Sequence, residues 1–103
     1  MKNAVAYMRS ATKRREGFKE QMSEIMRYCK EHDIEICHWY EDEGVSGMVS
    51  EKPGLESILK EARVFNAYIV VVANPSRISR NRENYDDYMM KLREAGIEVC
   101  YVS

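Results

Sequence analysis

Cysteine, histidine and long apolar runs are all scarce in this sequence of 103 residues. Its three cysteines form no C-x-x-C pair, and each lies in a segment predicted as helix or strand, so we expect free thiols. The two histidines have neither zinc-ligand spacing nor a cysteine partner, and we therefore expect no metal and no cofactor. The longest apolar run, 67–73, is far shorter than the roughly 20 residues of a membrane span.

The N-terminus also lacks the apolar stretch and cleavage site of a signal peptide, which predicts a cytoplasmic protein. Apolar residues make up 45% of the chain and charged residues 32%, as in an ordinary globular domain. We find no repeat and no linker, so residues 1–103 are interpreted as one domain. The net charge of −1 by itself indicates no nucleic-acid or membrane partner.

Strand and helix patterns alternate along the chain. Apolar or alternating runs predict four strands, at 3–8, 34–40, 68–73 and 97–102. Helical spacing of apolar residues predicts three helices: 18–31, one that begins at Pro53 and extends through Ala62, and one around 85–92 that ends at Gly96. Such alternation predicts an α/β fold, with a mainly parallel sheet of about four strands and helices on both faces.

Basic residues gather in two of the loops that leave the carboxyl ends of these strands. Seven of the 16 basic residues lie in the segments 9–15 and 74–82, which contain no acidic residue: Arg9, Lys13, Arg14, Arg15, Arg77, Arg80 and Arg82. Ligands of open α/β sheets bind at this edge, and arginine suits phosphate oxygens. The alternative is that these are solvated loop charges. The pattern predicts a phosphate-binding rim.

Several kinds of phosphate ligand lack their sequence signals. There is no G-x-G-x-x-G after the first strand and no G-x-x-x-x-G-K-[ST], so the cradles for dinucleotides and P-loop nucleotides are missing. A receiver domain would need acidic residues where Arg9 and the turn 74–76 stand. No cysteine lies in a phosphate-cradling loop, which argues against a thiol phosphatase. Polymeric phosphate remains as the ligand.

Five short motifs occur in order at these strand ends: residues 7–12 (YMRSAT), Gln21, residues 42–47 (DEGVSG), residues 52–55 (KPGL) and residues 76–80 (SRISR). Together they resemble the N-terminal catalytic domain of the serine recombinases, the resolvase/invertase and large serine integrase family. The resemblance extends from Val5 to Val102. It implies a DNA partner and site-specific DNA recombination, as in mobile elements.

In that family a serine just after the first strand attacks a DNA phosphate and forms a 5′-phosphoserine link, and arginines neutralise the charge of the transition state. The resemblance assigns catalytic positions to Tyr7, Arg9, Ala11, Gln21, Asp42, Ser46, Arg77 and Arg80. It assigns DNA phosphate binding to Arg9, Lys52, Arg77 and Arg80. Thr12 matches the threonine that follows the nucleophile.

Three positions depart from the family pattern. Ala11 stands where the nucleophilic serine is expected, Ser76 replaces an aspartate, and Lys52 replaces an arginine. An alanine methyl group cannot attack phosphorus. Ser10 is the alternative nucleophile, but neighbouring residues of an extended chain point to opposite faces, so we expect its side chain to point away from the arginines.

Three functions therefore stay open. The domain belongs to a recombinase whose strand cleavage is residual or lost, it is an inactive recombinase-like module for assembly or DNA regulation, or it is a small phosphoryl-binding α/β protein. Family members continue into a dimerisation helix and a DNA-binding region that this chain lacks, so we expect a homo-oligomer only of the intact protein. Ser46 also has an interpretation as a turn residue, and Ser76 as a helix N-cap.

Overall fold

The structure, a computed structural model, describes residues 2–12 and 16–103. Lys13, Arg14 and Arg15, three of the predicted rim charges, lie outside the described residues. The elements in chain order are β1 (Lys2–Ser10), α1 (Glu16–Glu31), β2 (Ile34–Glu43), α2 (Pro53–Glu61), the 3-10 helix η1 (Ala62–Phe65), β3 (Ile69–Val72), the 3-10 helix η2 (Pro75–Arg77), α3 (Arg82–Glu94) and β4 (Glu98–Tyr101).

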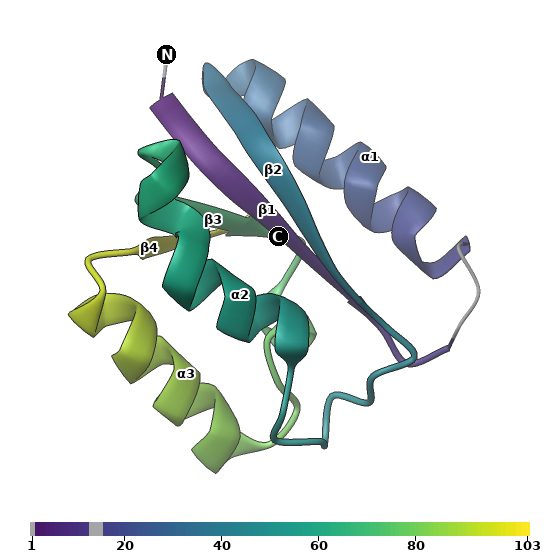
Figure 1. Cartoon of the computed structure of the whole chain (residues 1–103). Coiled ribbons are helices and arrows are strands. Elements are labelled where there is room, and N and C mark those ends of the chain that lie inside the picture. Colours follow the sequence, from purple (N-terminus) through teal and green to yellow (C-terminus); the bar gives the residue numbers. More distant parts are fainter. Residues whose placement is uncertain (1, 13–15) are drawn as a thin grey trace.

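The four strands form one parallel sheet in the order β2-β1-β3-β4. Helix α1 covers one face, and α2 and α3 cover the other (Figure 1). The α/β fold predicted from the alternating pattern is confirmed. β1 and β3 are parallel neighbours, and the connections that follow them cross opposite faces of the sheet, through α1 and α3. The loops after these two strands therefore flank the crevice where open α/β sheets bind ligands.

Side chains of β1 alternate between two hydrophobic cores. Val5 and Tyr7 face α2 and α3, whereas Ala4, Ala6 and Met8 face α1. Every one of these side chains is inaccessible to solvent, because a central parallel strand is covered on both faces. The alternation fixes the direction of the residues that follow in the same strand.

A β-bulge interrupts the pairing of β1 with β2. Ala4 pairs with Ile36 but Val5 pairs with His38, so Cys37 is the extra residue. The bulge reverses the alternation of β2: Ile36 and Trp39 both pack on the α1 side although they are three positions apart. Downstream of the bulge, even-numbered residues face α2.

Both β1 and β2 extend further than the sequence pattern predicted. The expected strands 3–8 and 34–40 are Lys2–Ser10 and Ile34–Glu43, because the parallel ladder continues through the pairs Arg9–Asp42 and Ser10–Glu43. Polar side chains hid these strand ends from a hydrophobicity pattern. Arg9 and Asp42, which were expected in loops, therefore lie at fixed positions in the sheet.

Two predicted helix boundaries are confirmed. Pro53 begins α2, where its missing N–H costs no hydrogen bond. Gly96 ends α3 in the left-handed conformation at φ 74°, and the N–H of Ile97 reaches back to the carbonyl of Leu92 at 2.8 Å.

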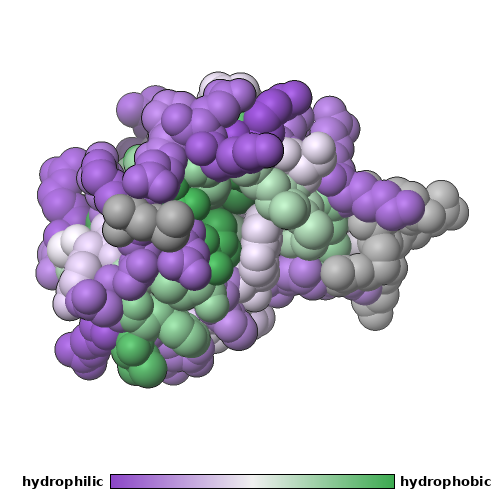
Figure 2. Space-filling model, turned by 90° about the horizontal axis from the view of Figure 1, so that it is seen from above, coloured by the Kyte–Doolittle hydropathy of each residue, from purple (hydrophilic) through white to green (hydrophobic). Residues whose placement is uncertain are grey.

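The face shown in Figure 2 is largely hydrophilic around its rim, and apolar side chains gather toward its middle. No helix among the described residues is long and apolar enough to cross a membrane. Within the same residues, no three His, Cys, Asp or Glu side chains group as metal ligands. Cys29, Cys37 and Cys100 are free thiols.

Candidate functional site

Arg9 is the centre of the site at the carboxyl edge of the sheet. Its side chain is 1% exposed and donates three hydrogen bonds to main-chain carbonyl oxygens. Nε donates to Arg77 at 3.0 Å, Nη2 to Ser76 at 2.8 Å and Nη1 to Val45 at 3.0 Å. Arg9 thus joins the end of β1 to η2 and to the loop after β2. Burial lowers the pKa of its guanidinium group, and the charges of Arg77 and Arg80 act in the same direction.

Arg77 lies beside Arg9, and the two residues exchange hydrogen bonds. Its Nη1 donates to the carbonyl oxygen of Arg9 at 3.2 Å. Its Nε is buried and has no hydrogen-bond partner among the described residues. A buried, unpaired guanidinium N–H is costly, and a phosphate oxygen is one group that could satisfy it.

Arg80 is exposed at the same edge, and Gly47 permits its close approach to Arg9. The N–H of Arg80 donates to the carbonyl of Gly47 at 2.9 Å, and Ser79 Oγ donates to the same oxygen at 3.2 Å. A Cβ on Gly47 would lie 2.7 Å from Arg80 Cγ and 2.8 Å from Arg9 Nη2. The structure therefore brings the three predicted arginines to one edge, where Arg9 and Arg80 pack against Gly47.

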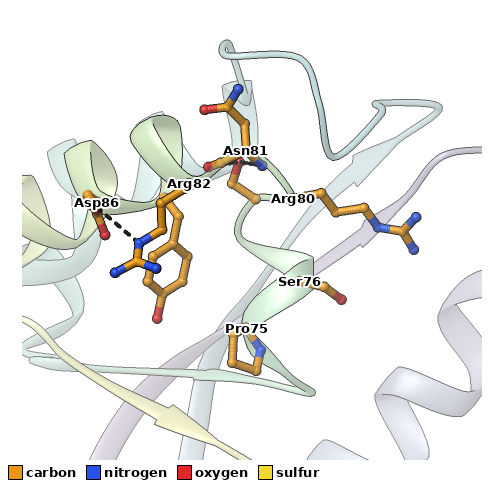
Figure 3. Close-up of a pocket in the computed structure, with 8 residues that line it drawn as sticks. Pro75, Ser76, Arg80, Asn81, Arg82 and Asp86 are labelled. Carbon is orange, nitrogen blue, oxygen red and sulfur yellow. Dashed lines mark hydrogen bonds and ion pairs between the residues drawn. The ribbon is translucent and has the colours of Figure 1, made fainter.

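Figure 3 shows the outer side of this segment. Arg80 extends away from Arg82, which pairs with Asp86 at 3.3 Å on the exposed face of α3. A hollow of about 440 Å³ lies between η2 and the first turn of α3, lined among others by Pro75, Arg80 and Arg82. Arg82 thus lies apart from the cluster around Arg9, with its charge paired to Asp86.

Asp42 is a buried carboxylate, 4% exposed, that links β1 to α2. Tyr7 donates its hydroxyl to Asp42 Oδ2, and the N–H of Gly54 donates to Oδ1, both at 2.7 Å. The residue before α2, Lys52, makes no side-chain cap, so Asp42 caps this helix from a neighbouring strand. Burial, and then the charge of Asp42, raises the pKa of Tyr7.

Gln21 holds the main chain of Arg9 from α1. Its Oε1 accepts from the N–H of Arg9 at 3.3 Å, and its Nε2 donates to the carbonyls of Arg9 at 3.0 Å and Gly17 at 2.7 Å. A buried amide side chain that satisfies both main-chain groups of one residue fixes that residue's position. Gln21 is a positioning residue here.

Ala11, which the resemblance places at the nucleophile position, is exposed and lies next to the loop after β2. The carbonyls of Ser10 and Thr12 on either side accept from the N–H groups of Val45 at 3.0 Å and Gly44 at 3.2 Å. Ala11 is therefore held on the same edge as the arginines, but it carries no atom that can attack phosphorus.

Ser10 points to the other side of the sheet, as expected from strand alternation. Its side chain is buried against the start of α1, where a Cβ on Gly17 would lie only 2.5 Å from its Oγ. The hydroxyl accepts from the N–H of Thr12 at 3.4 Å. The guanidinium group of Arg9 lies on the opposite face, so Ser10 does not face the arginine cluster.

Lys52 is fully buried, which sequence reasoning did not foresee. Its ammonium donates to the carbonyl oxygen of Val49 and to Asn84 Oδ1. The ring centroid of Tyr88 lies 5.8 Å away. Burial lowers the pKa of Lys52, and the positive charge of Arg9 adds to this effect, whereas Asp42 opposes it. Because its ammonium group is buried, Lys52 does not offer an exposed charge for the phosphate-binding role that the resemblance assigns to it.

Both serines with alternative interpretations make local contacts. Ser46 is exposed, and its Oγ accepts from the N–H of Met48 at 3.2 Å, as in a turn. The interpretation of Ser76 as an N-cap is wrong, because Asn74 precedes η2 and Asn81 caps α3. Ser76 Oγ instead donates to Asn74 Oδ1 at 2.5 Å.

Sequence reasoning missed the residues that fasten the loop after β2. They are Gly47, Gly54, Ser79, Asn84 and Tyr88. Helical spacing predicts that Tyr88 packs in the core, and its ring does pack there, but its hydroxyl donates to the carbonyl of Ser50 at 3.2 Å. Helical spacing reports which ring is buried and carries no signal for the partner of its hydroxyl.

The comparisons with known proteins agree with this fold. Residues 4–103 match the family model of the resolvase N-terminal domain, so the chain belongs to the resolvase family. No curated protein matches the sequence significantly.

Solved structures share the fold at low identity. The C-terminal catalytic domain of ISC1926 TnpA, an IS607-like serine recombinase, superimposes with a TM-score of 0.84 at 18% identity, over 98% of this chain and 67% of that one. The N-terminal catalytic domain of TP901-1 integrase gives 0.84 at 22% identity, over 98% and 78%. A resolvase family site-specific recombinase from Streptococcus pneumoniae gives 0.82 at 21%, over 99% and 72%.

Proposed function

We propose that this domain binds DNA phosphates at the edge formed by Arg9, Arg77 and Arg80, and that it belongs to a site-specific recombination system without itself forming the phosphoserine link. The observation that carries the proposal is the pairing of an assembled arginine cluster with Ala11 on the same edge. The scaffold of a serine recombinase is present, and its attacking hydroxyl is missing.

Family membership supports DNA as the partner, and the arginines support phosphate as the group that is bound. Arg80 is exposed, and the buried Nε of Arg77 has no hydrogen-bond partner among the described residues. Of the three clustered arginines, Arg77 and Arg80 are therefore the ones that we expect to contact a phosphate. Arg9 acts mainly by holding their loops.

Strand cleavage through Ser10 is the second candidate, and the direction of the Ser10 side chain speaks against it. Its Oγ lies against Gly17 on the α1 side, whereas the arginines lie on the other side of β1. For Ser10 to attack, the end of β1 would have to rotate and break its pairing with Glu43.

A covalent-adduct experiment tests the proposal. The parent protein, Ala11→Ser, Ala11→Ser/Ser76→Asp and Ser10→Ala are each incubated with a nicked DNA duplex and separated on a denaturing gel. In an active site, the serine oxygen would bond to phosphorus, its proton would leave to solvent, and the 3′ oxygen of the strand would be released.

We expect no adduct from the parent and an adduct only when residue 11 is serine. Adding Ser76→Asp is expected to increase the yield of adduct, because it restores the aspartate of the family pattern at the second departing position. An adduct from the parent that disappears in Ser10→Ala would show that Ser10 is the nucleophile and that the proposal is wrong.

A further inference from the structure

The loop between β2 and α2, residues 44–52, is held by hydrogen bonds at its first residues and along its carbonyl oxygens. The N–H groups of Gly44 and Val45 donate to the carbonyls of Thr12 and Ser10. Those of Val45, Gly47, Val49 and Ser50 accept bonds from outside or from the end of the loop. The donors are Arg9, Ser79, the N–H of Arg80, Lys52, Asn84 and Tyr88. The loop has no secondary structure of its own at residues 45–52, so its shape depends on these donors.

Lys52 makes the innermost of these contacts. Its ammonium is completely removed from solvent and lies among the Val49 carbonyl, Asn84 Oδ1 and the ring of Tyr88. Its main-chain N–H donates to the Tyr88 hydroxyl at 3.3 Å. Two oxygens and an aromatic face satisfy an ammonium group and leave it no path to an external phosphate.

We propose that Lys52 is a positioning residue that ties loop 44–52 to α3, and that it is not a phosphate ligand. The loop in turn accepts from the main chain of Arg80 through Gly47 and from the guanidinium group of Arg9 through Val45. By holding loop 44–52, Lys52 therefore helps to fix the positions of Arg9 and Arg80, which donate to the loop. Its effect on DNA rests on the proposed function above.

The chemistry of the position explains why lysine stands where the family pattern has arginine. The enclosure offers only two oxygen acceptors, at Val49 and Asn84, and it is closed to solvent. An ammonium is a compact donor that fits them. A guanidinium group has five N–H donors in a rigid plane and would leave several of them buried without partners.

Three proteins test the inference: the parent, Lys52→Met, and the matched control Lys60→Met, whose lysine is exposed on α2. Amide hydrogen exchange is followed at Val49 and Arg80, whose N–H groups are bonded within or onto the loop. Binding to a short DNA duplex is measured as a function of salt.

We expect Lys52→Met to accelerate exchange at these two amides about tenfold, the factor for loss of one or two hydrogen bonds, with strand β3 unchanged. DNA affinity should fall several-fold while the slope of log K against log salt stays that of the parent. Removing a lysine that contacts a phosphate would instead lower the slope by about 0.9. Lys60→Met should change neither quantity.

Asn84→Ala is a second variant for the case that Lys52→Met does not fold. It removes the acceptor of the ammonium and the donor to Ser50 without changing the charge, and we expect the same pattern of exchange and affinity. A slope lowered by about one in Lys52→Met, unchanged exchange at Val49 and Arg80, or unchanged affinity with a loosened loop would overturn the inference. If the parent binds no DNA, the proposed function fails, and the exchange measurement still decides whether Lys52 holds the loop.

Discussion

Arg9 and Arg77 each donate a hydrogen bond from the guanidinium group to the main-chain carbonyl of the other, at 3.0 and 3.2 Å. The exchange joins the end of β1 to η2, two segments that are 68 residues apart in the sequence. It requires two like charges to lie side by side at a buried edge. Their mutual repulsion would be relieved by an anion, which is the physical basis for the proposed binding of DNA phosphates at this edge.

Arg9 and Arg80, the two arginines that pack against Gly47, should contribute differently to the free energy of unfolding. Arg9→Met removes three charge-assisted bonds and leaves three carbonyl oxygens unpaired, so the free energy of unfolding should fall by about 2–4 kcal/mol. Arg80→Met removes an exposed side chain and should change it by less than about 0.5 kcal/mol. Urea unfolding of both variants measures the difference. Equal losses would contradict the assignment of Arg9 as the tie between the three segments.

DNA binding should depend on Arg77 and Arg80 through charge. The parent should bind a short duplex without sequence preference, at a Kd of about 10⁻⁴–10⁻⁶ M or weaker. Arg77→Ala and Arg80→Ala should each weaken binding and lower the salt slope by about 0.9. Arg93→Ala, at the other end of α3, is the matched control and should behave as the parent. Fluorescence anisotropy of labelled DNA over a salt series measures all four, and a common slope would show that the phosphates bind elsewhere.

Stability at alkaline pH should depend on Tyr7. Its pKa is raised by burial and by Asp42, so above pH 10 the unfolded chain releases a proton that the folded protein retains. Stability from this group is complete below about pH 10 and is lost above it, by up to about 1.4 kcal/mol per pH unit. Tyr7→Phe should therefore show a smaller alkaline loss in urea unfolding between about pH 10 and pH 11.5.

The same variant loses the bond to Asp42, so at pH 8 it should be less stable than the parent by about 1–3 kcal/mol. Tyr68→Phe alters a half-exposed tyrosine and should stay within about 0.5 kcal/mol of the parent at pH 8. An alkaline slope of Tyr7→Phe as steep as that of the parent would argue against a buried, neutral Tyr7.

A double-mutant cycle tests the direction of Ser10. Gly17→Ala places a Cβ 2.5 Å from Ser10 Oγ and should destabilise the protein by about 1–2 kcal/mol, although alanine normally favours a helix. In the Ser10→Ala background most of that loss should disappear, giving a coupling of at least about 1 kcal/mol. Thermal unfolding of the four proteins measures it. Strict additivity would mean that the hydroxyl points elsewhere, and cleavage by Ser10 would again be open.

Local patterns in the sequence determined the order of elements and much of their extent. Apolar runs located all four strands, Pro53 and Gly96 marked helix ends, and two acid-free basic segments located the rim. These signals depend on each residue's own conformational and hydrophobic preferences, which act over a few neighbours. They predicted the carboxyl edge of the sheet as the place of the site and arginine as its chemistry.

Only the tertiary structure decided what each polar side chain contacts. The bulge at Cys37 turns Asp42 to the face of Tyr7 and the start of α2, because one added residue reverses every later side chain in the strand. Burial then separated cations that look alike in the sequence: Arg9 and Lys52 bind carbonyl oxygens of the chain, and Arg80 stays at the surface. Whether a side chain is buried depends on segments far apart along the chain, so it cannot be predicted from composition and local spacing.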